Sequence, residues 1–159
     1  MKAASVHELQ KELKTLEPKR LLELCMRLAK YKKENKELIS YLLFEAHDEK
    51  NYIKQIKEEI DCLFIEMNKS SVYLAKKSLR KILRLTNKYI KYSDSKQTEL
   101  ELRIYFLTKI KAAHIPINAS TVLSNLYIRQ IEKIKTVLSK LHEDLQYDYQ
   151  QELEGLEFY

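Results

Sequence analysis

A single glycine, Gly155, occurs in the chain, and it stands near the end. Glycine is the residue that most easily adopts left-handed backbone and lets a main chain approach a phosphate or another strand closely. Hairpin-rich sheets, phosphate-binding loops and dinucleotide fingerprints depend on such positions. The sequence therefore predicts an all-α fold in which helices are joined by short polar turns.

The composition is typical of a folded protein with a highly charged surface, because 45% of the residues are hydrophobic and 33% are charged. We expect a single all-helical domain over residues 1–159, whose acidic end at residues 143–159 is a candidate for an extended or frayed segment. Cys25 and Cys62 stand in apolar stretches and are interpreted as core residues of a reducing compartment. Without a secretory or membrane-spanning pattern, a cytoplasmic location and no membrane partner are expected.

Capping residues and breaks predict about seven helices. Ser5 and Glu8 have the spacing of a capping box, and Pro18 suits the first turn of a second helix. The third helix, around residues 38–43, is apolar on more than one face and is expected to be central. We expect a helical bundle or a short α–α superhelix. Four further helices are predicted: one capped by Asp48 and ending near 67, one over residues 72–92, one through residues 100–110, and one capped by Asn118 and running from about 119 to 153.

Apolar residues alternate at spacings of three and four along residues 53–67 and again along residues 127–145. This spacing places them on one side of a helix. The simpler interpretation is that both rows form the internal core of the bundle. The alternative is self-association through the last helix. The candidate seam for self-association consists of Tyr127, Ile131, Ile134, Leu138, Leu141 and Leu145.

Positive charge is concentrated in residues 70–93, which contain seven basic side chains and no acidic one. On a helix these side chains cover one side, and apolar residues cover the opposite side. Lysine predominates, so attraction to phosphates without reading of bases is the most that this helix offers a nucleic acid. The candidate basic surface consists of Lys77, Arg80, Lys81, Arg84, Lys88 and Lys91.

Residues 143–159 are the reverse, with six acidic side chains and no lysine or arginine. Three interpretations of this charge pattern stay open. Both segments can be solvated faces. The acidic end can lie near the basic helix, within the chain or across a dimer. Alternatively, the basic helix can bind phosphates or an acidic partner.

No catalytic, metal or cofactor motif is recognisable. The four histidines are far apart and have no second ligand at metal spacing, and the two cysteines form no C-x-x-C pair. We therefore predict no catalytic residue, no metal ligand and no cofactor, and we expect that the protein is not an enzyme. The alternative is an enzyme whose active site is assembled from residues distant in sequence, which sequence motifs do not reveal.

Residues 5–16 (SVHELQKELKTL), followed by LLEL at 21–24 and ELISYL at 37–42, resemble the opening of small uncharacterised bacterial all-helical proteins. This resemblance implies an all-α fold and brings no activity or site residue. The same segment is similar to a SAP-type DNA-binding module, which pairs two short helices around a leucine pattern. Residues 16–20 (LEPKR) stand where that module has a glycine-containing turn.

From these features we predict a protein-interaction or scaffold module without catalysis, which binds a protein partner or a second copy of itself. The alternative is a nucleic-acid-associated protein that binds phosphates through the basic helix 72–92.

Overall fold

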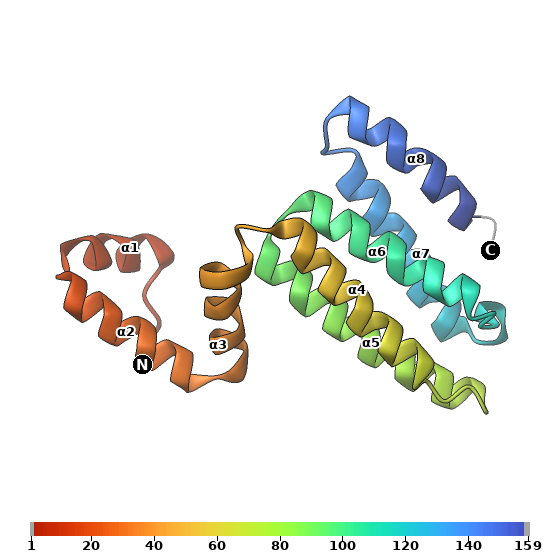
Figure 1. Ribbon diagram of the computed structural model, residues 1–159, viewed down its shortest axis with the longest axis horizontal. Helices are drawn as coiled ribbons and strands as arrows, with labels where there is room; N and C mark the ends of the chain where they lie inside the picture. The colour runs from red at the N-terminus through yellow and green to blue at the C-terminus, as the bar shows by residue number, and fades with distance from the viewer. Residues whose placement is uncertain (1, 158–159) are drawn as a thin grey trace. The chain divides into compact units, whose positions relative to one another are not determined.

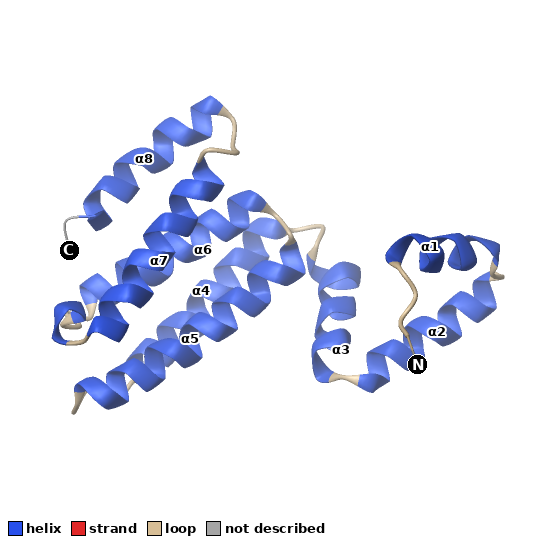
Figure 2. Ribbon diagram, turned by 180° about the vertical axis from the view of Figure 1, so that it is seen from behind, coloured by secondary structure: helices blue, strands red, loops and turns tan. Residues whose placement is uncertain are grey.

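The computed structural model describes residues 2–157 and confirms the all-α fold. The described residues form eight α-helices and no strand (Figure 2). They divide into two compact units, Met1–Phe44 and Glu45–Tyr159, which we call the N-terminal and C-terminal units. This division concerns packing, so the expectation of one folding domain stays a prediction.

The N-terminal unit contains α1 (Val6–Thr15), α2 (Pro18–Tyr31) and α3 (Lys33–Ser40), followed by a π-helical turn, Tyr41–Glu45, that leads into the C-terminal unit. The predicted capping box is present, since the Glu8 amide donates to Ser5 Oγ at 3.3 Å and the Ser5 amide donates to the Glu8 carboxylate at 2.7 Å. Pro18 occupies the first turn of α2, as expected. Helix α2 packs against α3.

The expectation that the third helix is central is wrong. Helix α3 ends at Ser40, and Leu42 and Leu43 lie in the wider π-helical turn, where they are 58% and 66% exposed. Apolar residues on several faces are typical of a buried helix only when neighbouring helices cover those faces. Among residues 2–44, Tyr41 is the one buried side chain.

The C-terminal unit is a five-helix bundle built around one central helix. It contains α4 (Glu49–Ile65), α5 (Val72–Ser93), α6 (Lys96–Ala112), a 3₁₀ turn (Ile117–Ala119), α7 (Thr121–Leu138) and α8 (Glu143–Glu157). Helix α6 packs against each of the other four α-helices of the unit (Figure 1).

The sequence of α6 explains its central position, because apolar residues follow one another around the helix instead of forming a single stripe. Leu100 and Leu102 face different directions, yet both are fully buried. The same holds for Phe106 and Leu107. A helix with buried apolar residues on most of its sides is stable in water only when other helices pack around it.

Short polar residues cap the helices of this unit. The Asp48 carboxylate accepts from the Asn51 amide at 3.1 Å at the start of α4. Ser71 and Ser95 accept in the same way from residues in the first turns of α5 and α6. The prediction that Asn118 caps the last long helix is wrong. Asn118 lies in the 3₁₀ turn, and Ser120 holds the position before α7.

The predicted helix 119–153 is two helices, α7 and α8, separated by residues 139–142. No proline or glycine marks this break, so the local sequence did not reveal it. The cause is packing. The turn brings Leu153 and Leu156 back to the bundle, where both are buried. A continuous helix would carry Leu153 roughly 22 Å beyond Leu138 at ~1.5 Å per residue.

The acidic end is helical from Glu143 to Glu157, so the expectation of an extended or frayed segment is wrong there; residues 158 and 159 lie outside the described part. Helix α8 packs on α6 and α7. The Tyr127 hydroxyl donates to the Leu156 carbonyl at 2.9 Å, and Lys111 Nζ donates to the Gly155 carbonyl at 2.8 Å. Within residues 2–157 no ion pair joins α8 to the basic helix α5.

Both cysteines are exposed free thiols, which corrects the interpretation of them as core residues. Cys25 lies on α2, whose residues are all at least partly exposed. Cys62 lies on the outer side of α4, because the neighbouring Ile60 and Phe64 take the inner positions.

Left-handed backbone is supplied by residues other than glycine. Asp94 (φ 53°) ends α5, and His114 (φ 50°) follows α6. Both are positive-φ positions that polar side chains tolerate better than branched ones. Gly155 instead lies inside α8, and a Cβ added there would meet no atom within 4 Å.

Gly155→Ala is therefore expected to stabilise the protein by about 0.5–1 kcal/mol, because alanine loses less backbone entropy than glycine in a helix. Urea unfolding of the full chain measures the change. Gln151→Ala, one turn earlier on the exposed side of α8, is the matched control and should change the free energy of unfolding by less. A loss of stability in Gly155→Ala would contradict the helical conformation of this residue.

Candidate functional site

The predicted basic surface lies on α5 and faces solvent along most of its length. Lys77, Arg80, Lys81, Arg84 and Lys91 are exposed. None of these five has a hydrogen bond or ion pair with another described residue. The opposite side of α5 is buried, as predicted, through Ala75, Leu79, Ile82, Thr86 and Ile90.

Lys88 differs from the other members of this surface. It is half-buried, and its Nζ lies 4.8 Å from the ring centre of Tyr89 and 5.9 Å from that of Tyr92. Such cation–π contacts hold the lysine ammonium group against the aromatic rings. Lys88 therefore belongs to the tyrosine cluster between α4 and α5, where the Tyr52 hydroxyl also donates to the Tyr89 carbonyl.

The candidate self-association seam lies largely inside the C-terminal unit. Tyr127, Ile134 and Leu138 are buried, and Ile131 is half-buried on the same helix. Leu141, in the turn before α8, and Leu145, in the first turn of α8, are half-buried. These positions support the interpretation of the seam as internal core, and a buried side chain has no face left for a second copy.

A groove of about 720 Å³ lies between α5, α6 and α7. Four lysines line it: Lys91 from α5, Lys96 from α6, Lys133 from α7, and Lys140 from the turn that follows α7. We call it the lysine groove. None of the four has a hydrogen bond or ion pair with a described residue. Sequence reasoning found only Lys91, although the i, i+7 spacing of Lys133 and Lys140 placed them on one face of the predicted helix 119–153.

Arg103 forms the floor of the lysine groove and is 5% exposed. Its guanidinium donates to the Glu99 carboxylate at 2.8 Å, with a second contact at 2.6 Å. It also donates to Asn87 Oδ1 on α5 at 3.0 Å and to Gln130 Oε1 on α7 at 2.7 Å. Arg103 therefore links α5 and α7, the two walls of the groove. The carboxylate of Glu99 compensates the positive charge of Arg103.

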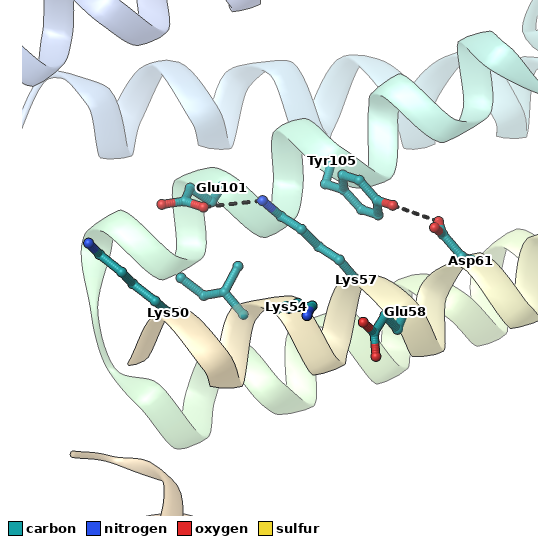
Figure 3. A pocket seen from close by; sticks show the side chains of 8 residues that line it. Lys50, Lys54, Lys57, Glu58, Asp61, Glu101 and Tyr105 are labelled. Atoms are coloured by element: carbon teal, nitrogen blue, oxygen red, sulfur yellow. Dashed lines mark hydrogen bonds and ion pairs between the residues drawn. The ribbon is translucent and has the colours of Figure 1, made fainter. Parts of the chain in front are cut away.

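A second groove, of about 400 Å³, lies between α4 and α6 (Figure 3). Four of its polar side chains pair with one another across the two helices. The Tyr105 hydroxyl donates to Asp61 at 2.7 Å, and Lys57 Nζ lies 3.2 Å from Glu101 (Figure 3). Lys109 pairs with the same Asp61 at 2.7 Å. The mutual pairing of these groups indicates that they hold α4 against α6.

The titration of this cluster follows from its contacts. Burial, and then the hydrogen bond to Asp61, raise the pKa of Tyr105 above its usual range. The hydrogen bond to Asp61 also raises the pKa of Lys109. Burial, followed by the nearby charge of Glu101, raises the pKa of Tyr149 on α8. Both hydroxyls therefore hold their protons to higher pH than an ordinary tyrosine does, and they act as hydrogen-bond donors.

Within residues 2–157, no three His, Cys, Asp or Glu side chains are grouped closely enough to hold a metal ion. In the same range every helix is too short or too polar to cross a lipid bilayer.

Comparisons with models of protein families, with curated proteins and with solved structures found no match to this chain. The function proposed below therefore depends on the geometry of the described residues.

Replacing Arg103 tests its role in joining α5, α6 and α7. Arg103→Leu leaves Glu99, Asn87 and Gln130 without their donor, and we expect a loss of about 2–3 kcal/mol in the free energy of unfolding. Urea unfolding measures the loss. Arg80→Leu, which removes an exposed arginine with no partner among the described residues, should change it by less than ~0.5 kcal/mol. Equal effects of the two variants would refute the bridging role.

The Tyr105–Asp61–Lys109 cluster predicts a loss of stability at alkaline pH. A folded-state pKa above the unfolded value means that the folded state holds the proton more tightly. The contribution of Tyr105 to the free energy of unfolding is therefore complete below the usual tyrosine pKa of about 10. It is lost as the pH rises above that value. The melting temperature of the wild type should fall between pH 9 and 11 more steeply than that of Tyr105→Phe. Tyr147→Phe, at an exposed position, is the control and should follow the wild type.

Proposed function

We propose that this chain is a non-catalytic protein-interaction module. In this proposal the C-terminal unit is a stable scaffold, and helices α1–α3 with the adjoining π-helical turn bind another polypeptide. The observation that supports it is the number of large apolar side chains that the first 44 residues leave exposed. They are Val6, Leu9, Leu13, Leu22, Met26, Leu28, Tyr31, Leu42, Leu43 and Phe44.

The exposed side chains of α1 form a continuous stripe. Val6, Leu9 and Leu13 follow one another at spacings of three and four, so they lie on one face of the helix. They are 82%, 51% and 42% exposed. Apolar patches of this kind on a protein surface are typical of binding sites for other proteins.

The lengths of the helices support the same proposal. Helices α1, α2 and α3 contain 10, 14 and 8 residues. Helices shorter than ~12–15 residues are marginal in water unless an apolar face is covered. Because none of the three contains a buried residue, their own packing supplies little of this stabilisation. A bound polypeptide that covers Leu9 and Leu13 would supply it.

A second copy of the chain is the first partner to test. Sedimentation velocity of the full chain over a wide concentration range should show reversible association. Leu9→Gln with Leu13→Gln removes the stripe from α1 and should yield a monomer at concentrations where the wild type associates. The substitutions are at exposed positions, so the melting temperature of the C-terminal unit should stay unchanged.

The matched control is Lys11→Gln with Lys14→Gln, which changes two residues on the other faces of α1 and should leave association intact. If the wild type is monomeric at all concentrations, self-association is refuted. If in addition hydrogen exchange shows α1 protected in that monomer, the need for a partner to cover the stripe is refuted too.

Nucleic-acid association is the second candidate function. The specific observation in its favour is that the exposed basic side chains of α5 carry no compensating charge from the described residues. In particular, the acidic helix α8 packs on α6 and α7. An uncompensated row of positive charge attracts phosphates in a strongly salt-dependent way.

A further inference from the structure

We propose that the lysine groove between α5, α6 and α7 binds the phosphodiester backbone of a nucleic acid without reading its bases. This inference rests on the second candidate function, nucleic-acid association, and places its binding site in a concave surface formed by three helices. The observation that supports it is that Lys91 and Lys96 line the same groove as Lys133 and Lys140, which are distant from them in sequence.

The charge of the groove is strongly positive. Five basic and two acidic side chains line it. Glu99 is paired with Arg103, which leaves the four lysines against Asp94 alone. A concave surface lined by charge of one sign concentrates the electrostatic potential more than a convex helix face does. The groove is therefore a stronger site for an anion than the outer side of α5.

The basic rows continue beyond the groove along both walls. Arg129 and Lys133 are four residues apart on one side of α7, and Lys140 follows in the turn after this helix. Arg129 is exposed and has no hydrogen bond or ion pair among the described residues.

The second wall runs along α5. Arg84 and Lys91 are seven residues apart on the same side of this helix, and both are exposed. The two walls are held at a fixed separation, because Arg103 bonds Asn87 on α5 and Gln130 on α7. A groove whose walls are fixed in this way is organised before the ligand arrives, which lowers the entropic cost of binding.

The chemistry of the lining determines the class of ligand. Lysine is a point charge that suits phosphates without fixing their orientation. The residues that line the groove contain no aromatic ring on which a base could stack. A flat membrane surface would meet the outer side of α5 before it reached the groove. A chain of phosphates that can enter the groove fits these conditions best.

Fluorescence anisotropy of the full chain with a labelled mixed-sequence RNA strand and with the corresponding DNA duplex tests the proposal at several salt concentrations. Lys133→Gln with Lys140→Gln removes two charges from the groove. Lys77→Gln with Lys81→Gln removes two charges from the outer side of α5 and is the matched control. Lys91 is left unchanged in both variants, because it belongs to both surfaces.

We expect the groove variant to bind about tenfold more weakly and to lower the salt slope by roughly 1.4–1.8, since each lost phosphate contact contributes ~0.7–0.9. The control should bind within about twofold of the wild type. Unchanged melting temperatures would show that both variants are folded.

Three results would overturn the proposal. Loss of binding in the control alone would refute binding in the groove. It would instead assign nucleic-acid association to the outer side of α5. No binding by the wild type at low salt would refute both the groove and nucleic-acid association. Displacement of the RNA by polyglutamate as effectively as by unlabelled RNA would assign the groove to an acidic polypeptide.

Discussion

The C-terminal unit depends on the burial of α6. This helix has buried apolar residues on most of its sides, so it is stable only when α4, α5, α7 and α8 pack around it. Each surrounding helix buries one stripe against α6 and presents its other side to water. The packing of α5 against α6 therefore explains why the outer side of α5 is charged, whether or not this side binds a ligand. The same burial explains the turn at residues 139–142, because α8 must reverse direction to place Leu153 and Leu156 in the core.

Polar bonds around α6 give the apolar packing its specific geometry. Arg103 bonds partners on α5 and α7, and Asp61 on α4 accepts from Tyr105 and pairs with Lys109 on α6. Apolar contacts alone tolerate sliding of one helix along another, whereas charge-assisted hydrogen bonds require particular distances. In the lysine groove this matters for binding as well as for folding, because the positions of Lys91 and Lys133 follow from the positions of the helices that carry them.

The sequence predicted features that depend on local chemistry. The capping box at Ser5 and Glu8, Pro18 in the first turn of α2 and the cap at Asp48 are confirmed, because each is determined within a few residues. Features that depend on distant partners were missed. The spacing of Leu138, Leu141 and Leu145 favoured one continuous helix, and only the contacts of α8 with α6 and α7 explain the break. The basic side of α5 was visible in the sequence, but the groove was not, because α6 and α7 complete it. Similarly, the left-handed positions expected of glycine are taken by Asp94 and His114.

The exposure of the two cysteines has a practical consequence. Cys25 lies in the N-terminal unit and Cys62 in the C-terminal unit, and the sequence contains no third cysteine. The natural chain therefore offers one attachment site for a spin label or a dye in each unit, without any engineered substitution. A pair of labels at these thiols would report the separation of the two units in solution directly, both in the free protein and after a partner or a nucleic acid is added.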